Sequence, residues 1–368
     1  MKSFCLKTLL LIGIPVFLAI SCNNDDEEHI ADTGGIAAET QVRFVEDSLP
    51  YPRLSDYGFF EGKLSELQPV SGVLPYDLIT PLFSDYALKK RFVWMKPGSK
   101  ASYVADHKAL NFEDGTVLIK HFYYENVQPG GGVKDMETRI MYRIGGEWHF
   151  AEYIWDEAGD EAHLHMDGAY LPVAWLDASG NEKGVDYRFP SELECFTCHK
   201  SGTNAIPLGP KPQNLDKDYP YTTGAQNQLL KWAAMGYLDG QIPTEINRLV
   251  AYDDPSEELG ERLRSYLDVN CSSCHLEGSH CDYRPIRLAW NESESLENLG
   301  VCIEPQEFIN SALSYIISPG NTARSAMHHR MQSVDEGERM PLLGRSLVHE
   351  EGLQLLTEYI NSLETFCE

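Results

Sequence analysis

The chain has 368 residues, of which 30 are lysine or arginine and 56 are aspartate or glutamate, so its formal net charge is −26. An acidic excess of this size argues against nucleic acid and against an anionic membrane surface as binding partners. It predicts a protein whose copies repel one another in solution.

The first 21 residues have the pattern of a secretory signal peptide. Lysines provide a basic start, and the apolar run over 9–20 is too short to span a bilayer. Cys22 follows "LAIS", which resembles the lipobox of bacterial lipoproteins, where the cysteine is acylated; the alternative is secretion with Cys22 left free. We therefore expect an exported lipoprotein, anchored in the outer membrane and facing the periplasm or the cell surface. Residues 22–45 are predicted to be a solvated tether, because large apolar side chains are almost absent from 23–40.

Residues 46–188 are predicted to form an antiparallel, sandwich-like β domain, with a distorted barrel as the alternative. Four runs in this region are dense in β-branched and aromatic residues and alternate partly with period two. Gly145 and Gly146 stand between two of these runs, which suits a two-residue hairpin. The four runs cover 91–95, 115–127, 138–144 and 147–155.

A charged cluster precedes and enters the first of these runs. We expect it to be the solvated start of a strand. Its members are Asp85, Lys89, Lys90 and Arg91.

Two C-x-x-C-H motifs follow the β-rich region, and this pattern is the attachment signature of c-type haem. Two thiols three residues apart on a helical turn lie on one side, so both can bond the vinyl-derived carbons of one haem. The histidine that follows then reaches the iron as a strong axial ligand. Two such motifs in one exported chain predict two covalently bound haem c groups. The motif residues are Cys195, Cys198 and His199 in the first, and Cys271, Cys274 and His275 in the second.

Two other kinds of site share part of this pattern. A zinc site would pair two C-x-x-C units, and a redox dithiol would resemble the motif of thioredoxin-like proteins. A thioredoxin-like motif should follow a strand in a βαβ unit, and no such pattern precedes either motif in the sequence.

The second axial ligand of the first haem is left open by the sequence. Met235 is the only methionine between the two motifs, and it falls off the apolar stripe of the helix predicted around it. His163 and His165 lie upstream beside Met166. We expect either a histidine ligand, with His165 as the first candidate, or a weakly held sixth position.

For the second haem the sequence favours Met340 as the second axial ligand, opposite His275. Pro341 follows Met340, removes a backbone donor and holds the chain extended, which aims the thioether at the iron. The combination of methionine and histidine raises the reduction potential of a haem. The competing residues in the same region are Met327, His328, His329 and Met331.

Helical patterns surround the second motif. Asp254 and Pro255 suit a helix cap and a first helical residue, and predict a helix of about four turns that ends at the motif. An apolar stripe within 349–366 predicts a C-terminal helix. We therefore expect a first haem-binding segment over 189–252 and a second domain, similar to cytochrome c, over 253–368. The expected fold class is multidomain, an all-β domain followed by α-helical haem domains.

Three cysteines remain after the signal peptide, the acylation site and the motifs are accounted for. Cys281 and Cys302 bracket the segment between the second motif and Met340, and a disulfide between them would contribute about 3 kcal/mol. Cys367 is then left without an assigned partner.

Stretches in both halves of the chain resemble, in order, a family of bacterial secreted di-haem c-type cytochromes. They include "LPYDLITPLFSDYALKKRFVWM", "CFTCHK", "NCSSCH" and "RMPLLGR". The resemblance covers most of 50–366 and implies haem attachment at both motifs with Met340 as a ligand. Similar modules occur beside or fused to sugar dehydrogenases of the glucose/sorbosone type, which implies such a dehydrogenase as redox partner.

The leading functional hypothesis is therefore electron transfer, in which the chain accepts electrons from a dehydrogenase. The alternative is a di-haem peroxidase or oxidase in which the iron at His199 has an open position. A third hypothesis makes the β domain a binding module for a sugar or a partner protein, with the haems as its connection to a redox chain.

Overall fold

The structure, a computed structural model, describes residues 42–364, 366 and 367. The expected signal peptide, the acylation site Cys22 and the expected tether up to residue 41 lie outside the described residues. Within the described part, no helix is both long enough and apolar enough to cross a membrane.

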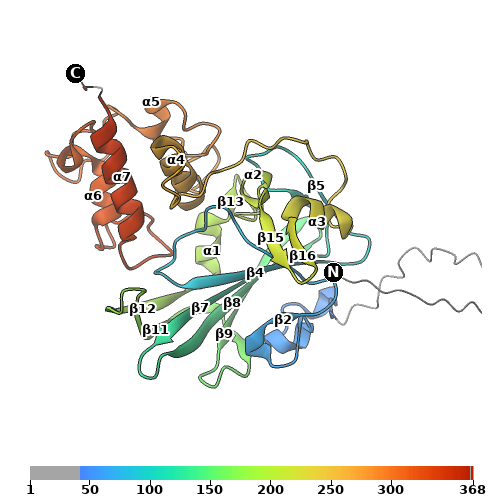
Figure 1. The fold of residues 1–368 in the computed structure, drawn as a ribbon. Helices are drawn as coiled ribbons and strands as arrows, with labels where there is room; N and C mark the ends of the chain where they lie inside the picture. Colours follow the sequence, from blue (N-terminus) through green and yellow to red (C-terminus); the bar gives the residue numbers. More distant parts are fainter. Residues whose placement is uncertain (1–41, 365, 368) are drawn as a thin grey trace, which may run out of the picture. The chain divides into compact units, whose positions relative to one another are not determined.

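The largest element of the described chain is an antiparallel sheet of eight strands (Figure 1). Strands β10, β9, β8, β7, β11 and β12 follow one another across it, while β4 also pairs with β7, and β3 pairs with β4. The strands are β3 (Leu74–Tyr76), β4 (Leu88–Met95), β7 (Thr116–Val127), β8 (Gly132–Ile144), β9 (Glu147–Trp155), β10 (Ala162–Leu164), β11 (Asp167–Leu176) and β12 (Glu182–Ser191).

The other elements are short strand pairs and α-helices. The strand pairs are β1 (Phe60–Glu61) with β2 (Gln68–Pro69), β5 (Ala101–Ser102) with β6 (Asn111–Phe112), β13 (Lys200–Ser201) with β14 (Asn204–Ala205), and β15 (Asp218–Tyr221) with β16 (Gly224–Asn227). The helices are α1 (Glu192–Cys198), α2 (Pro212–Leu215), α3 (Gln228–Ala234), α4 (Leu259–Asn270), α5 (Leu296–Leu299), α6 (Ala326–Gln332) and α7 (Glu350–Ser362).

All four predicted strand runs belong to the large sheet, as parts of β4, β7, β8 and β9. In the β8–β9 hairpin, Ile144 pairs with Glu147, and Gly145 and Gly146 have φ angles of 62° and 81°. Both angles lie in the left-handed region, which glycine adopts without steric cost. The two-residue hairpin predicted here is therefore confirmed.

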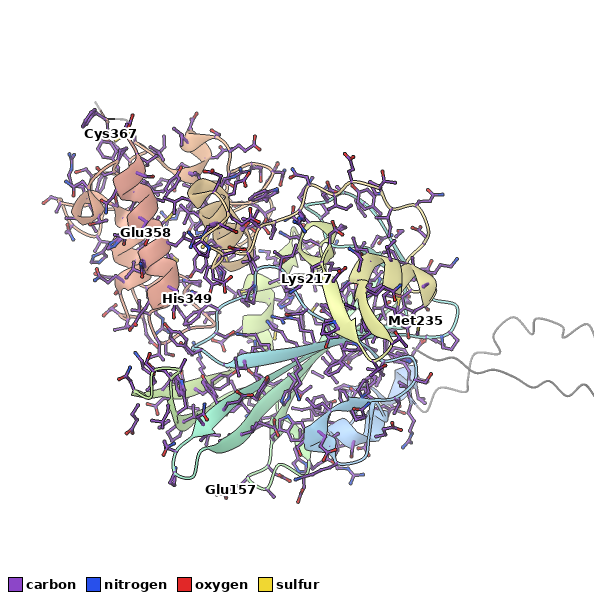
Figure 2. The ribbon with its side chains drawn as sticks, in the orientation of Figure 1. Glu157, Lys217, Met235, His349, Glu358 and Cys367 are labelled. Carbon is purple, nitrogen blue, oxygen red and sulfur yellow. A yellow bond between two sulfur atoms is a disulfide. The ribbon has the colours of Figure 1, made fainter. Side chains whose placement is uncertain are left out.

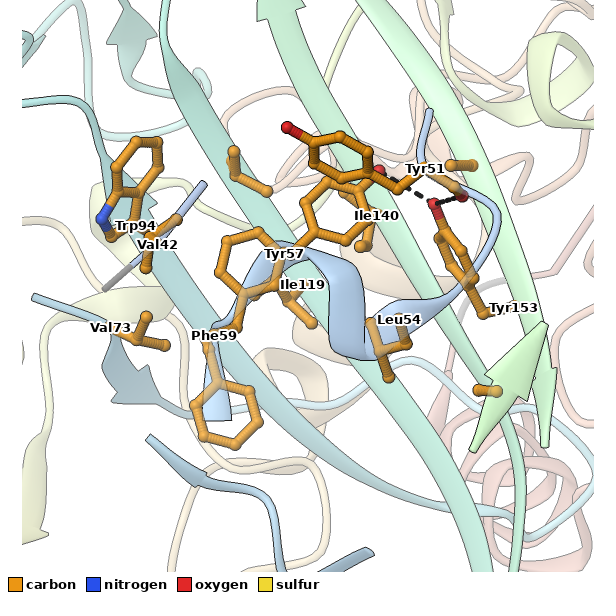
Figure 3. Packing of buried hydrophobic residues seen from close by; sticks show 14 of the residues in the cluster. Val42, Tyr51, Leu54, Tyr57, Phe59, Val73, Trp94, Ile119, Ile140 and Tyr153 are labelled. Carbon is orange, nitrogen blue, oxygen red and sulfur yellow. Dashed lines mark hydrogen bonds between the residues drawn. The ribbon is translucent and has the colours of Figure 1, made fainter. Parts of the chain in front are cut away.

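The N-terminal segment of the described chain covers one face of the sheet (Figure 3). Tyr57 and Phe59 lie in one buried cluster with Trp94 of β4, and the hydroxyl groups of Tyr57 and Tyr153 are hydrogen-bonded at 2.8 Å. Val42 belongs to the same cluster and is only 8% exposed. The packed chain thus already includes Val42, which we had expected to belong to the tether.

The opposite face of the sheet is covered largely by chain that follows β12. Val93, Leu118 and Phe150 project from this face into a buried cluster with Leu229 and Trp232 of α3. Because the side chains of a strand point alternately to the two faces, one sheet can serve both buried clusters. This arrangement places the segment after β12, which carries the first C-x-x-C-H motif, against the sheet.

Helices α4 and α7 pack on each other in a third buried cluster (Figure 1). Leu263 and Leu356 are fully buried there. Helix α7 confirms the predicted C-terminal helix, but α4 begins at Leu259 and not at the predicted cap. The carboxylate of Asp254 instead accepts hydrogen bonds from the backbone N–H and hydroxyl of Ser256, which makes a local turn.

The expected fold class is wrong. Strands make up 29% and helices 21% of the described residues, and the seven α-helices among them do not form a set of α-helical cytochrome domains. The β region is also one large sheet, flanked by the small strand pairs β1–β2 and β5–β6 and by irregular chain, and not two large packed sheets. Glycine and proline interrupt the segment after the first motif, where strand pairs β13–β14 and β15–β16 replace the expected helices.

The expected disulfide is also wrong. Cys302 is bonded to Cys367, 65 residues later, and Cys281 is a buried free thiol. Cys367 follows α7, and α7 belongs to the same buried cluster as Cys302. Packing of the C-terminal helix therefore brings the last cysteine to Cys302, which spacing along the chain does not show.

Candidate functional site

The first C-x-x-C-H motif lies on a short helix that begins where β12 ends. The carboxylate of Glu194 accepts a hydrogen bond of 2.9 Å from the backbone N–H of Ser191, which caps the start of α1. The backbone N–H of His199 donates to the carbonyl of Cys195 at 2.9 Å, so the helical turn continues through Cys198. The two cysteines are therefore held on consecutive positions of one helical face, as the sequence predicted.

The tautomer and the protonation state of His199 leave one ring nitrogen able to bind a metal. Its Nδ1 lies 2.9 Å from the carbonyl oxygen of Ile206. A carbonyl can only accept a hydrogen bond, so Nδ1 carries the proton and Nε2 keeps a free lone pair. Burial lowers the pKa of His199 to about 4, so the ring is neutral near pH 7. A fixed tautomer with a free Nε2 is the state in which histidine binds a metal.

The second motif lies at the end of α4. The backbone N–H of Cys271 donates to the carbonyl of Leu267, and those of Cys274 and His275 donate back to the carbonyl of Cys271 at 3.1 Å. The ring Nδ1 of His275 is buried and has no hydrogen-bond partner in the described chain. Burial, followed by nearby arginines, lowers the pKa of His275 to about 4, so this ring is also neutral near pH 7.

The two motifs touch each other. The thiols of Cys198 and Cys274 are close enough to form a hydrogen bond, which lowers the pKa of Cys198 and raises that of Cys274. The thiol of Cys274 also lies 4.0 Å from the carbonyl oxygen of Thr197, 77 residues earlier in the chain. Just beyond the motifs, the backbone N–H of Gly202 donates to the carbonyl of Gly278 at 2.9 Å. Two motifs that are far apart in the sequence therefore form one site.

The contact between the motifs does not gather their side chains into a ready metal centre. In the part of the chain that the structure describes, no three histidine, cysteine, aspartate or glutamate side chains are arranged to hold a metal ion. The zinc alternative therefore gains no geometric support from these residues.

A cavity of about 1320 Å³ is lined by the sheet and by residues of both motifs. It is larger than the roughly 300–1,000 Å³ of typical small-molecule sites. Phe150 of β9 projects to this wall, and its ring lies 5.4 Å from that of His199 in an edge-to-face arrangement. His275 and Met340 do not line the cavity. The motif residues that line it are Cys195, Cys198, His199 and Cys274.

The structure places the candidate ligands of the first haem differently from the sequence. Met235 lies at the exposed end of α3 and does not line the cavity (Figure 2). Neither His163 nor His165 lines the cavity, whereas Met166 does. The sulfur of Met166 accepts a hydrogen bond of 3.3 Å from the backbone N–H of Glu152. The carbonyl of Met166 accepts a hydrogen bond of 3.0 Å from the backbone N–H of Glu192 in α1, so Met166, and not the favoured His165, lies at the cavity beside the first motif.

Met340 is brought to the second motif, and so is Met331. Both methionines line a small cavity of about 10 Å³ together with Cys271. The backbone N–H of Met340 donates to the carbonyl of Arg330 at 3.0 Å, and Nε of Arg345 donates to the carbonyl of Met340 at 3.0 Å. The loop that carries Met340 is therefore held against α6, but the geometry does not separate Met340 from Met331.

The other competing ligands near α6 are engaged elsewhere. Nε2 of His328 lies 3.0 Å from the hydroxyl of Thr357, and Nε2 of His329 lies 2.9 Å from a carboxylate oxygen of Glu338. Met327 packs at the edge of the buried cluster around α4 and α7.

His349, which the sequence did not single out as a site residue, lines the small cavity together with Met340. It is 9% exposed, its Nδ1 is 3.0 Å from the hydroxyl of Tyr266, and its ring stacks on Phe83 at 4.1 Å. Burial lowers the pKa of His349 to about 4.

This burial predicts an acid-sensitive fold. The pKa of His349 is about 4 in the folded chain and about 6.5 in the unfolded chain, so the unfolded chain binds the extra proton. The contribution to stability is therefore complete above about pH 6.5 and is lost as the pH falls to about 4, with a loss of about 2–4 kcal/mol. Denaturant unfolding between pH 4 and 8 measures it, and His349→Gln should flatten the profile over this interval. Equal slopes for both chains would contradict the assignment.

A row of charged residues crosses the wall of the large cavity, and the sequence analysis missed it. The row runs through Arg91, Lys120, Arg139 and Glu152, which are cross-strand partners on β4, β7, β8 and β9. Their alternation with Val93, Leu118, Met141 and Phe150 places them on the face that is otherwise apolar. Charged residues at inward positions of three or more neighbouring strands are the signal that could have revealed the row.

Asp85 and Arg91 are buried, although we expected a solvated start of a strand. The carboxylate of Asp85 accepts hydrogen bonds of 2.7–2.9 Å from the backbone N–H groups of Ser346 and Leu347. It therefore connects the edge of the sheet to the loop that follows Met340.

Comparison with known proteins gives no relative: no family model, no curated protein and no solved structure matches the chain.

Proposed function

We propose that the chain is a di-haem c-type cytochrome that carries electrons, with one covalently bound haem c at each C-x-x-C-H motif. The observation that carries the proposal is the contact between the motifs, where the thiol of Cys274 lies 4.0 Å from the carbonyl oxygen of Thr197 between Cys195 and Cys198. Electron tunnelling becomes slower steeply with distance. Two haems attached at adjoining motifs would therefore have a short path between them.

The residues of the first motif suit a haem. His199 has its Nδ1 proton held by Ile206 and its Nε2 free, which orients the ring as an axial ligand. Cys195 and Cys198 line a cavity of about 1320 Å³, on the same side as His199. Each haem, when bound, supplies an iron that takes up and releases one electron. The contribution of the chain is to attach the ring, orient His199 and exclude water with apolar side chains such as Phe150.

For the second haem we propose attachment at Cys271 and Cys274, with His275 and Met340 as the iron ligands. The support is the shared small cavity of Met340 and Cys271, together with the two backbone hydrogen bonds that hold the loop of Met340.

Features of the sequence support a proposal for the partner and the location. A net charge of −26 favours docking to a redox partner with a basic face, and we propose a dehydrogenase, such as one acting on sugars, as the electron donor. We further propose that the chain is an exported lipoprotein of the outer membrane, held by acylated Cys22 and facing the periplasm or the cell surface.

Intact mass spectrometry of the chain, produced with the c-type haem maturation machinery, tests the proposal. We expect two haem additions in the native chain, and one in each of Cys195→Ser and Cys271→Ser, because each variant lacks one thiol of one motif. The control is Cys281→Ser, because Cys281 is a free cysteine outside the motifs; this variant should keep both haem additions. A native chain without haem, or with zinc in its place, would refute the proposal.

A second candidate function is a di-haem peroxidase or oxidase, and the cavity beside His199 favours it. A small substrate such as peroxide could reach the iron through a cavity of this size. The haem-loaded chain, reduced and mixed with peroxide, separates the two functions. A carrier should show low-spin irons and no turnover, whereas rapid peroxide reduction with a reduced cytochrome as donor would establish the enzyme.

A further inference from the structure

The charged row on the cavity wall has an excess of positive groups. Arg91 pairs with Lys120, Lys120 with Arg139, and Arg139 with Glu152 across neighbouring antiparallel strands. Residues directly opposite each other in such a sheet project to the same face. All four line the large cavity, in a chain whose overall charge is strongly negative.

The existing partners of these cations leave donors unused. Nη1 of Arg91 donates to the carboxylate of Asp77 at 2.7 Å, but Nη2 is buried without a partner, and the residue is only 5% exposed. Arg139 makes a bidentate pair with Glu137 through Nε and Nη2. Within the described chain, no carboxylate lies within ion-pairing distance of Lys120, whose ammonium packs 4.9 Å from the ring of Phe122.

The fourth member of the row pairs with Arg139, where Oε1 of Glu152 lies 3.8 Å from Nε, a separation too long for a hydrogen bond. Glu152 is 5% exposed, and both of its carboxyl oxygens are buried without a hydrogen-bond partner. Burial and the neighbouring Glu137 raise the pKa of Glu152 well above its usual value, because both disfavour its charged form. Burial, and then the charges of neighbouring cations such as Arg91, lower the pKa of Lys120 well below its usual value. A negative charge in the cavity would oppose that shift and would also satisfy the free donor of Arg91.

The row and the first motif share one cavity, which Arg91, Lys120 and Arg139 line together with Cys198 and His199. All these residues line the same cavity, so a ligand seated beside His199 would face the row.

We propose that Arg91 and Lys120, supported by the positive charge of Arg139, form a binding site for carboxylate groups on the wall of the cavity. Nη2 of Arg91 and Nζ of Lys120 are its donors. Two sources supply this chemistry: the two propionates of a haem at the first motif, which rests on the proposed function, or a small dicarboxylate that enters the cavity.

The test compares the native full chain with Lys120→Met, with Lys120→Arg and with Lys108→Gln. Lys108 is an exposed lysine of the same cavity that takes no part in the row, so its variant controls for the loss of one positive charge. Haem content is measured first by mass, which decides the proposed function separately. Each chain is then titrated with succinate by calorimetry, and the midpoint potentials of haem-loaded chains are measured.

Propionates in the site predict that succinate does not bind the haem-loaded chain and that Lys120→Met lowers one midpoint potential, because the reduced iron loses a nearby positive charge. A free dicarboxylate predicts that succinate binds the native chain and binds Lys120→Met at least about tenfold more weakly. Succinate binding that weakens in Lys120→Met is also the expected result if the chain carries no haem. In every case Lys120→Arg and Lys108→Gln should behave as the native chain. If neither succinate binding nor any midpoint potential depends on residue 120, the site is refuted.

Discussion

Replacing Met340 by leucine is expected to remove the sulfur-to-iron charge-transfer band from the oxidised spectrum of the haem-loaded chain. One of the two midpoint potentials should fall by on the order of 100 mV, within the roughly 0.8 V over which axial ligands set haem potentials. The physical reason is that a thioether ligand favours the reduced iron, whereas leucine fills a similar volume without a sulfur atom. Optical spectra and potentiometric titration measure the two effects.

The matched control is Met331→Leu. Met331 lines the same small cavity beside Cys271 and is 8% exposed, so it competes with Met340 for the same iron. The band and both potentials should survive this substitution, because leucine conserves the packing volume in α6. Loss of the band in Met331→Leu, with its retention in Met340→Leu, would identify Met331 of α6 as the iron ligand.

Replacing Cys302 by alanine is expected to lower the free energy of unfolding by about 4 kcal/mol. The disulfide with Cys367 closes a loop of 65 residues, and a cross-link of that span removes much of the conformational freedom of the unfolded chain. Denaturant unfolding measures the loss, with native and variant chains compared at equal haem content. The variant should also expose the end of α7 to faster proteolysis, because Cys367 lies just beyond that helix.

Cys281→Ala is the control for this loss, because Cys281 is a buried thiol without a disulfide partner. Its cost should be about 1 kcal/mol, the value typical of removing a small buried group. Equal losses in both variants would instead favour the pairing of Cys281 with Cys302 that we expected from the sequence.

Local patterns predicted those elements that depend on neighbouring residues. The β8–β9 hairpin follows from Gly145 and Gly146, because a tight turn needs positive φ angles that glycine adopts freely. The apolar stripe of α7 predicted a helix whose Leu356 is fully buried. The C-x-x-C-H spacing likewise identified the two motifs, since it concerns one helical turn each.

Other elements were predicted wrongly where either a competing local contact or tertiary packing overrode the expected pattern. The sequence suggested a cap at Asp254, but its carboxylate closes a separate turn with Ser256, and α4 starts at Leu259. The prediction of the fold class was wrong because of tertiary packing. Short helices and strand pairs after β12 are stabilised by the face of the large sheet that they cover, and not by their own propensities.

By itself, the sequence determined the acidic charge, four strands of the large sheet, the C-terminal helix and the residues of both motifs. Only the tertiary structure decided that Cys198 meets Cys274, that Cys302 pairs with Cys367 and that Arg91 and Lys120 face the cavity of His199. The physical reason is the separation along the chain of the residues that interact. Helical and hairpin patterns express interactions between residues a few positions apart, whereas these contacts join segments that only the burial of the sheet faces brings together.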